Sequence, residues 1–408
     1  MSTLYLYNIG LLATPEGTAS RTGAAQGEVR LRRNAAVLCE DGVIAQVWEG
    51  AHEAPAAAVR IDARGALVTP GLCDCHTHLV FGGWRQHEVP LKLRGASYLE
   101  ILQAGGGILD TVRRTRECGE EDLFRRSGAF LDEMLRLGVT SVELKSGYGL
   151  DYGTEFKQLR VIRRLRDTRA QELVPTFLGA HAVPPEYAGD ADGYIKALCE
   201  RVLPDVAERQ MAEYCDVFCE TGVFNVGQSR RLLQTARALG LGLKIHADEI
   251  DAIGGTVLAG ELGAVSAEHL IATDERGMDA LAAGHVTAAL LPATSFYLNK
   301  TYARARDMIA RDIPVAVASD FNPGSCPSLN LQLCINLAYL KYRLTPAEIL
   351  TAVTLNAACA MGRGARCGSV EQGKRADLVV WDAADLETLC YRLGSNLART
   401  VICKGEIV

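Results

Sequence analysis

Two histidines separated by one residue, His76 and His78, follow an apolar run of the chain and could bind one metal ion together. Side chains along a strand repeat with a period of two, so both imidazoles would lie on one side, ~7 Å apart, and could converge on a cation at the strand end. Ions such as zinc favour imidazole ligands. A pair of surface histidines, or a redox pair formed by Cys73 and Cys75, are the alternatives at this point.

The elements that would position these histidines alternate between strand-like and helix-like patterns. Apolar residues at near-helical spacing predict helices over residues 120–137, with Gly138 as the stop, and over residues 225–239. Seven short β-rich runs follow the strand that leads to His76. They cover residues 140–144, 174–178, 216–219, 243–246, 264–267, 286–291 and 315–318. Eight strands alternating with helices predict a (β/α)8 TIM-like barrel, with a doubly wound open sheet as the alternative.

The two ends of the chain differ from the middle because both are rich in short strands separated by turn-like stretches. We therefore predict that residues 1–65 and 357–408 together form one small β-sandwich domain. Residues 66–356 would form the barrel.

Composition excludes several classes of protein. The 408 residues are 48% hydrophobic and 23% charged, as in globular proteins, and the net charge of -6 gives no electrostatic case for nucleic acid. No apolar run approaches the ~18 residues of a membrane span, and the start of the chain has no secretory signal pattern. Thirteen scattered cysteines suit reduced thiols in a cytoplasm better than a disulfide framework. We expect a cytoplasmic protein with neither a membrane nor a nucleic-acid partner.

Catalytic groups of such a barrel stand at the C-terminal ends of its strands. Five of the eight histidines fall at predicted strand ends, namely His76, His78, His181, His246 and His269, and Asp320 follows the eighth strand. One strand-end histidine is more often structural, but five with an aspartate indicate a site. The other three are His52, His87 and His285, and we expect His52 and His285 at the surface.

This pattern resembles the amidohydrolase superfamily, whose metal site combines His-x-His on strand one with histidines on strands five and six and an aspartate on strand eight. Within it, the chain is similar to the imidazolonepropionase family. The similar blocks are residues 70–116 (with 76–81 and 103–108), 143–150, 177–187, 245–250 and 320–325. The resemblance implies hydrolytic ring opening of the small molecule 4-imidazolone-5-propanoate to N-formimino-L-glutamate in histidine degradation, by a homodimer.

The resemblance also implies that His76, His78, His246 and Asp320 bind one Zn or Fe ion per subunit, which activates a water molecule. The sequence does not choose between the two metals. Two-metal members of the superfamily carry a carbamylated lysine after strand four. Here that place holds Glu220, between Cys219 and Thr221. We expect one metal, although Glu220 could in principle bind a second.

By the same resemblance, Glu249, His269 and Asp320 form the catalytic group. Glu249, three residues beyond His246, would be the proton shuttle and touch the ring; a helix-start carboxylate is the alternative. His269 would orient Asp320 or the water, or be purely structural. Lys145, which follows strand two, is interpreted as structural.

Substrate contacts complete the implied site. A planar guanidinium suits the propanoate group, and Arg85 stands in the matching position, with a solvated loop arginine as the alternative. The other residues implied are Tyr148 and His181 at the ring and carboxylate, and Asn322, Gly324 and Ser325 in a product-binding loop. Trp84 and Cys326 depart from the family pattern, and we interpret Cys326 as a buried, inert thiol.

Two alternatives to imidazolonepropionase stay open. An aminoazine or nucleobase deaminase shares the metal ligands and a glutamate near the strand-five histidine. It does not share the combination of Arg85, Tyr148, His181 and the loop after Asp320. A non-catalytic relative would use the barrel as a binding scaffold, but such proteins usually lose metal ligands.

Overall fold

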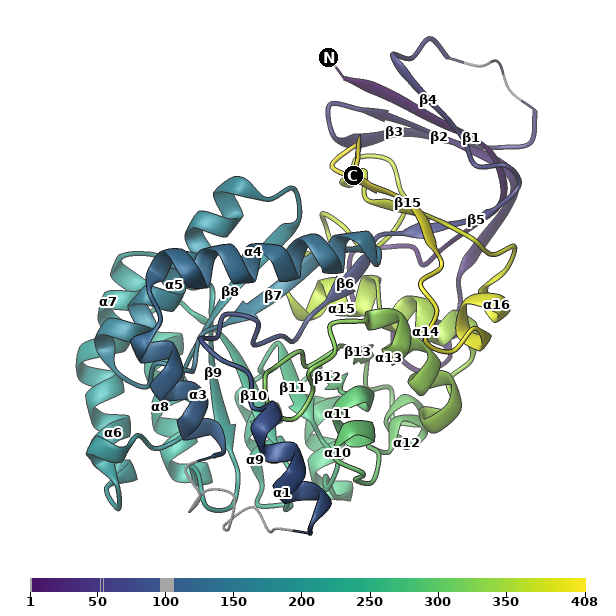
Figure 1. Ribbon diagram of the computed structural model, residues 1–408. Coiled ribbons are helices and arrows are strands. Elements are labelled where there is room, and N and C mark those ends of the chain that lie inside the picture. The colour runs from purple at the N-terminus through teal and green to yellow at the C-terminus, as the bar shows by residue number, and fades with distance from the viewer. Residues whose placement is uncertain (1, 52, 54, 96–105) are drawn as a thin grey trace.

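The computed structural model describes residues 2–51, 53, 55–95 and 106–408. Figure 1 shows a barrel of strands surrounded by helices, and a sheet built from both ends of the chain beside it. His52 and residues 103–105 of one similar block lie outside the described residues. The surface prediction for His52 therefore stays a prediction.

The middle of the chain forms eight parallel strands, as the sequence predicts. They are β6 (Leu72–Asp74), β7 (Val139–Lys145), β8 (Glu172–Ala180), β9 (Tyr214–Cys219), β10 (Gly242–Ala247), β11 (Ser266–His269), β12 (Thr287–Leu290) and β13 (Val315–Val317). Just beyond β6 and β13, the Asp320 amide donates to the His76 carbonyl at 3.1 Å and the His78 amide to the Phe321 carbonyl at 2.9 Å. These bonds join the first and eighth strands, so the predicted (β/α)8 barrel is confirmed.

Helices cover the outside of the barrel because their apolar faces pack on the strands. In α4 (Glu120–Arg136) the buried side chains include Leu123, Leu131 and Met134, as the apolar spacing predicts. Asn225 caps α8 (Val226–Ala238) in a reciprocal capping box. The other helices are α1 (Val89–Leu93), α3 (Ile108–Glu117), α5 (Tyr152–Thr168), α6 (Ala191–Ala197), α7 (Leu203–Glu208), α9 (Gly255–Glu261), α10 (Glu275–Ala283), α11 (Pro292–Tyr297), α12 (Ala305–Ala310), α13 (Leu331–Leu337), α14 (Pro346–Ala352), α15 (Leu355–Ala360) and α16 (Leu386–Tyr391).

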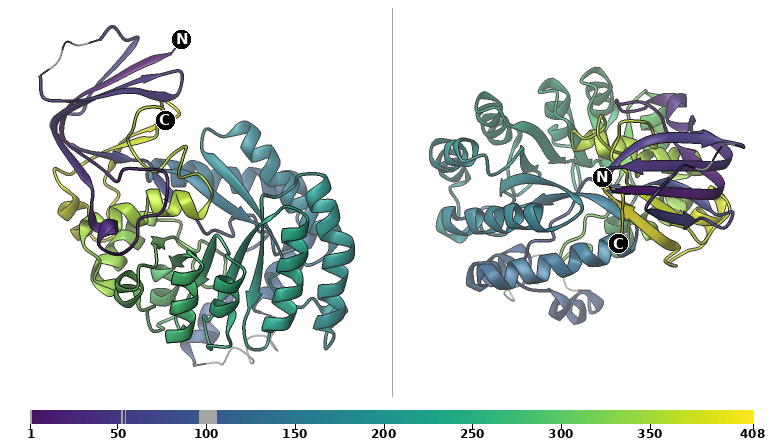
Figure 2. Two further views of the ribbon diagram at one scale, coloured as in Figure 1. Left: turned by 180° about the vertical axis from the view of Figure 1, so that it is seen from behind. Right: turned by 90° about the horizontal axis from the view of Figure 1, so that it is seen from above.

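Strands from both ends of the chain form one continuous mixed sheet in the order β16-β15-β14-β5-β1-β2-β3, with β4 paired to β1. The strands are β1 (Thr3–Thr14), β2 (Arg30–Glu40), β3 (Val43–Glu49), β4 (Val59–Asp62), β5 (Leu67–Pro70), β14 (Leu378–Trp381), β15 (Ala398–Cys403) and β16 (Glu406–Ile407). Leu6 and Val37 share one buried core with Leu378 and Ile402, so the two arms of the sheet face each other. Figure 2 shows both chain ends in this sheet. The predicted β domain built from both termini is confirmed.

The two parts of the molecule are closely joined. β5 pairs with β1 and β14 in the terminal sheet, and β6 begins the barrel two residues later. Gln26, from the first part of the chain, exchanges two 3.1 Å hydrogen bonds with the backbone of Val315 on β13. The predicted domain limits, with residues 1–65 and 357–408 in one domain and residues 66–356 in the other, stay a prediction.

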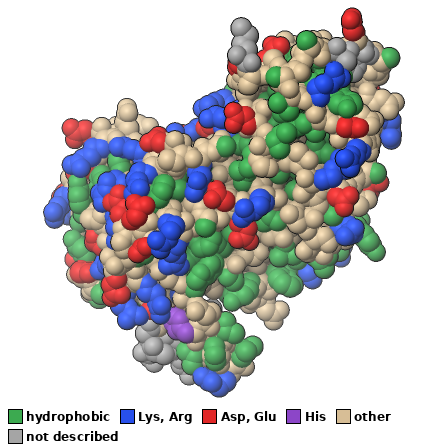
Figure 3. Space-filling model, turned by 45° about the horizontal axis from the view of Figure 1, so that its top comes forward, with side chains coloured by type: hydrophobic (Ala, Val, Ile, Leu, Met, Phe, Trp, Pro, Cys, Tyr) green, Lys and Arg blue, Asp and Glu red, His purple; other side chains and the backbone are tan. Residues whose placement is uncertain are grey.

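The surface carries interspersed charges of both signs. On the face in Figure 3, Lys and Arg side chains lie among Asp and Glu side chains. Between α4 and α5, Arg164 pairs with Glu121 and Arg160 with Glu120, each at 2.9 Å. Among the described residues, no helix combines the length and the apolar character needed to cross a membrane. All thirteen cysteines are free thiols.

Gly138 offers a test of the contact between barrel and terminal sheet. It ends α4 with a left-handed φ of +94°, and a Cβ there would lie 3.2 Å from Val379 and 3.4 Å from Trp381. Gly240 ends α8 with a φ of +85° and open space around it, which makes it a matched control. Gly240→Ala should cost about 1 kcal/mol, for the left-handed backbone alone. Gly138→Ala should cost about 1–3 kcal/mol more, because the added methyl overpacks the contact.

Urea unfolding of both variants measures this difference. An equal loss in free energy of unfolding for the two variants would contradict a tightly packed contact at Gly138.

Candidate metal and catalytic site

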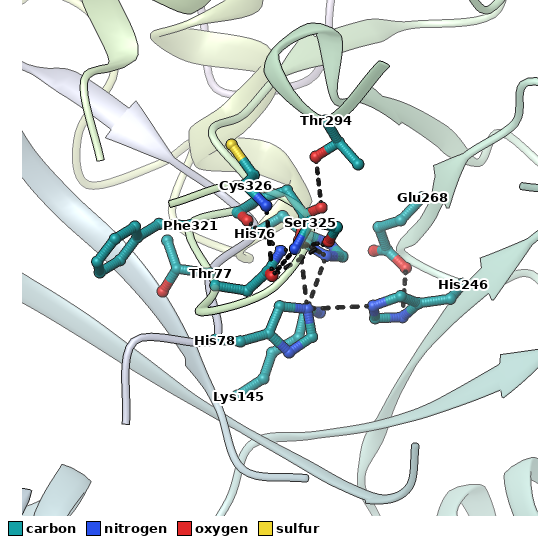
Figure 4. A network of polar contacts seen from close by, with 12 residues as sticks. His76, Thr77, His78, Lys145, His246, Glu268, Thr294, Phe321, Ser325 and Cys326 are labelled. Atoms are coloured by element: carbon teal, nitrogen blue, oxygen red, sulfur yellow. Dashed lines mark hydrogen bonds and ion pairs between the residues drawn. The ribbon is translucent and has the colours of Figure 1, made fainter. Parts of the chain in front are cut away.

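Four buried side chains from three parts of the barrel converge at its C-terminal end. His76 and His78 follow β6, His246 lies on β10, and Asp320 follows β13. The Nε2 atom of His78 lies 3.2 Å from that of His76 and 3.3 Å from that of His246. The Oδ1 atom of Asp320 lies 3.5 Å from Nε2 of both His76 and His78. Figure 4 shows the imidazoles of His76, His78 and His246 pointing toward one another.

This arrangement fits a metal ion. Burial lowers the pKa of His76 and His78 well below the ordinary value, so both imidazoles are neutral and their lone pairs face a common point. A tetrahedral ion with N and O ligands at its usual bond lengths separates neighbouring donor atoms by about 3.3 Å. Burial also raises the pKa of Asp320 to about 7, and a cation beside this carboxylate would favour its ionised form. These residues can therefore hold an ion through three nitrogens and one oxygen.

The backbone at the strand ends has an uncommon conformation. Asp248, His269 and Asp320 have left-handed φ values of 50°, 71° and 56°. Non-glycine residues rarely adopt this region, and such strain concentrates at functional sites. Here these residues stand directly after β10, at the last residue of β11 and three residues after β13, where the chain leaves the barrel strands.

Asp216 on β9 fixes the orientation of His246. Its two carboxylate oxygens lie 3.1 and 3.0 Å from Nδ1 of His246. Burial alone would raise the pKa of Asp216, but the charges of His246 and Lys145 outweigh burial and hold it well below its ordinary value. An ionised carboxylate can only accept, so Nδ1 of His246 carries a proton, and Nε2 is the nitrogen that faces the site and can bind an ion.

A buried ionic cluster lies beneath the metal site. Lys145 contacts Asp216 at 2.7 Å and Glu143 at 3.0 Å, and Lys244 contacts Glu143 at 3.0 Å. Glu268 on β11 lies 3.9 Å from Nδ1 of His246. These side chains are fully buried, so three carboxylates and two ammonium groups share the interior of the barrel.

The structural interpretation of Lys145 agrees with this position. Sequence reasoning missed the other members of the cluster, but a signal was present. Glu143 and Lys145 are two residues apart in an apolar strand, as are Lys244 and His246, and this period places each pair on one face of its strand.

The predicted substrate residues Tyr148 and His181 lie beside the metal site. The His181 ring stacks on His78 with centroids 4.9 Å apart, and the Tyr148 ring centroid is 5.3 Å from that of His181. His181 Nδ1 lies 3.0 Å from the Gly147 carbonyl, and burial lowers the pKa of His181 to about 3. Burial raises the pKa of Tyr148, while the nearby Arg85 charge opposes this effect. A neutral imidazole, a phenol and a guanidinium therefore come together.

The loop after Asp320 is shaped by Asn322. Its Oδ1 accepts hydrogen bonds from the amides of Gly324 at 2.9 Å and Ser325 at 2.7 Å, and its Nδ2 donates to the Asp320 carbonyl at 2.7 Å. A Cβ at position 324 would overlap the Arg85 guanidinium. Asn322 thus holds the turn, and the small Gly324 lets Arg85 pack against it.

Glu249 and His269, the two remaining predicted catalytic residues, lie close to each other. The Oε2 atom of Glu249 lies 3.8 Å from Nε2 of His269, and its Oε1 lies 3.5 Å from Nζ of Lys300. Burial would raise the pKa of Glu249, but His269 and Lys300 outweigh burial and lower it. Burial lowers the pKa of His269 to about 4. Lys300 was missed by sequence reasoning, because it lies in a turn without a strand-end signal.

Other residues named from the sequence lie outside this group. Trp84 packs in an aromatic cluster, with ring centroids 4.8 Å from Phe81 and 5.8 Å from Phe321. The thiol of Cys326 is buried, which raises its pKa to about 12, and it donates to the Ser319 carbonyl at 3.2 Å. This agrees with the predicted inert thiol.

Glu220, considered from the sequence for a second metal, lies in a loop. Its carboxylate accepts hydrogen bonds from the amides of Thr221 at 2.8 Å, Ile250 at 2.9 Å and Asp251 at 3.2 Å. These bonds hold the segment that follows His246. His285 is exposed, as predicted.

Known proteins are similar to this chain over nearly its full length. A model of the Amidohydrolase family matches residues 67–408. An imidazolonepropionase of Bacillus velezensis is 47% identical over 405 residues, which cover 99% of this chain and 96% of that protein. An imidazolonepropionase of Alkaliphilus metalliredigens is 46% identical, with 100% of this chain and 98% of that protein covered.

Two solved structures share the fold at low identity. A 5-methylcytosine deaminase from Klebsiella pneumoniae has a TM-score of 0.75 at 18% identity, with 99% of this chain and 97% of that chain covered. An E. coli guanine deaminase has a TM-score of 0.74 at 16% identity, with 100% of this chain and 99% of that chain covered.

Removal of the Lys145 ammonium tests the ionic cluster. Lys145→Met leaves Asp216 and Glu143 buried without that partner and should lower the free energy of unfolding by about 3–5 kcal/mol. Lys196→Met, which removes an exposed lysine 4.0 Å from Glu200, should change it by less than about 0.5 kcal/mol. Urea unfolding measures both values. A Lys145→Met variant as stable as Lys196→Met would mean that the cluster needs no ammonium at this position.

Proposed function

The chain belongs to the amidohydrolase family and, within it, to the imidazolonepropionases, and we propose that its strand-end site opens the ring of 4-imidazolone-5-propanoate with water. The product is N-formimino-L-glutamate, an intermediate of histidine degradation. The observation that supports this most strongly is the 47% identity over nearly the full length of an imidazolonepropionase. The convergence of His76, His78, His246 and Asp320 supports a metal-dependent reaction independently.

One Zn or Fe ion per subunit would be held by His76, His78, His246 and Asp320. A bound ion supplies Lewis acidity and lowers the pKa of water toward neutrality. A set of three imidazoles and one carboxylate suits either metal. Asp216 supports this role because its carboxylate accepts the Nδ1 proton of His246 and so directs Nε2 toward the ion.

Arg85, Tyr148 and His181 would bind the substrate. The planar Arg85 fork matches the propanoate group through two parallel hydrogen bonds. The neutral His181 ring and the Tyr148 hydroxyl would border the imidazolone ring. In this proposal the ring carbonyl would lie near the metal ligands, and the propanoate would lie at the loop of Gly324 and Ser325.

Glu249 would move the proton that ring opening requires. Its carboxylate accepts a proton as water attacks the ring carbonyl, and it returns that proton to the ring nitrogen when the C–N bond breaks. His269, 3.8 Å away, would orient Glu249, and the ionised state of Glu249 suits a base. Oδ1 of Asp320, the oxygen that faces His76 and His78, would also point toward the attacking water. Asn322, Gly324 and Ser325 would meet the open-chain product.

Two further properties follow from the family resemblance as proposals. A homodimer is expected and can be measured by analytical ultracentrifugation. A cytoplasmic location is expected and can be measured by cell fractionation. The free state of the thirteen cysteines suits a reducing compartment.

The decisive experiment combines an assay with a metal measurement. Purified protein is mixed with freshly made 4-imidazolone-5-propanoate, loss of ultraviolet absorbance is followed, and the metal content of the same sample is determined. Fast loss with about one metal ion per chain is expected. Turnover of guanine or 5-methylcytosine in place of the imidazolone acid would indicate a deaminase instead.

Arg85→Ala should weaken substrate binding far more than it changes metal content. Loss of a charge-assisted hydrogen-bonding partner costs about 1.5–3 kcal/mol, so KM should rise by about 10- to 100-fold. Arg85→Lys keeps the charge but loses the planar fork, so its KM should lie between that of Arg85→Ala and that of the wild type. An equal loss of metal and substrate affinity would show that Arg85 is structural.

Glu249→Gln should keep its metal but lose turnover. The amide has the shape of the carboxylate and cannot carry the proton, so kcat should fall by about 10²- to 10⁴-fold. Metal analysis and steady-state kinetics on one preparation provide the measurement. A near-wild-type kcat would exclude Glu249 as the proton shuttle.

A further inference from the structure

The segment that follows the seventh barrel strand, β12, reaches both carboxylates of the site. It consists of α11 and the turn up to Lys300. Sequence reasoning assigned no functional residue to it. Two of its side chains, Thr294 and Lys300, contact Asp320 and Glu249.

Thr294 contacts the oxygen of Asp320 that does not face the imidazoles. Its hydroxyl donates to Oδ2 of Asp320 at 2.5 Å, whereas Oδ1 lies 3.5 Å from Nε2 of His76 and His78. Thr294 is buried, and Figure 4 shows its hydroxyl directed at the site. The hydroxyl therefore occupies one oxygen and leaves the other for an ion.

Lys300 contacts the oxygen of Glu249 that does not face His269. Its ammonium lies 3.5 Å from Oε1, while Oε2 lies 3.8 Å from Nε2 of His269. The Lys300 side chain is 36% exposed and that of Glu249 is 13% exposed. The carboxylate is thus held between a cation at the rim of the site and an imidazole inside it.

One turn holds the two side chains in a fixed relation. The Leu298 amide donates to the Thr294 carbonyl at 3.0 Å, and the Lys300 amide donates to the Ser295 carbonyl at 2.9 Å. Asn299, between them, has a left-handed φ of 50°, which directs the chain back toward the barrel mouth. Backbone hydrogen bonds therefore link the segment of Thr294 to that of Lys300.

We propose that residues 292–300 are the positioning element of the site: Thr294 directs Asp320 toward the ion, and Lys300 holds Glu249 in place for proton transfer. The role of Lys300 rests on the proposed function, whereas the role of Thr294 rests on the metal site alone. Neither residue is a catalytic residue, because each acts through a carboxylate.

The Thr294 part is tested by metal affinity. Thr294→Val keeps the shape and removes the donor, so Asp320 becomes free to rotate, and affinity for Zn²⁺ in a chelator competition should fall about 10- to 100-fold. Thr294→Ser keeps the hydroxyl, so its Zn²⁺ affinity should be close to that of the wild type. Thr351→Val is the matched control, because Thr351 is buried and its hydroxyl has no hydrogen-bond partner among the described residues. A Thr294→Val variant with the affinity of the control would overturn the proposal.

The Lys300 part is tested by separating kcat from KM. Lys300→Met should keep its metal and lower kcat about 10-fold or more, with KM within about 3-fold of wild type, because only the alignment of Glu249 is lost. Lys300→Arg should restore most of kcat, and the exposed control Lys196→Met should leave both parameters unchanged. A raised KM with an unchanged kcat would overturn the proposal and make Lys300 a substrate-binding residue. Wild-type values of both parameters would also overturn it.

The two tests separate this inference from the function on which it partly rests. Chelator competition needs no substrate, so its result holds whatever the enzyme turns over. A wild-type protein inert toward the imidazolone acid would overturn the proposed function and the role of Lys300. A Thr294→Val variant with wild-type metal affinity would overturn the positioning element alone.

Discussion

The ion pair between Lys145 and Asp216 is the interaction on which the site depends. Taking a carboxylate out of water without a partner costs several kcal/mol, so Asp216 can stay ionised inside the barrel only beside an ammonium group. Its ionised state in turn fixes the proton of His246 on Nδ1. Strands two, four and five of the barrel thus act together on one ligand, and the metal site depends on the ionic cluster beneath it.

The site combines this rigid base with a rim built from turns. The imidazoles of His76, His78 and His246 stand on or directly after strands, where the closed sheet fixes them. Asp320 and Glu249 lie farther along, in segments whose orientation depends on neighbouring side chains. The positions of the three imidazoles therefore come from the fold, whereas the positions of the two carboxylates come from contacts between loops.

The sequence was sufficient to predict the barrel and the meeting of His76, His78 and His246 at one end of it, because strand ends carry a strong signal. His246 follows an apolar strand, and its neighbours match a family motif, so its place could be predicted. Asp216 could not be assigned in this way, because one aspartate inside an apolar run does not reveal which histidine it contacts. Thr294 and Lys300 lie in a helix and turn of ordinary composition, and their partners are 26 and 51 residues away. Such pairings depend on the packing of loops, which no local pattern contains.

The junction between β5 and β6 has a consequence for protein synthesis. β5 pairs with β14, which emerges from the ribosome only after all eight barrel strands. Until then, one edge of β5 lacks its partner, directly beside the strand that carries His76 and His78. The nascent chain must therefore protect an open sheet edge while the barrel assembles. A ribosome that stalls near residue 370 leaves a chain that contains His76, His78, His246 and Asp320 but has an incomplete terminal sheet.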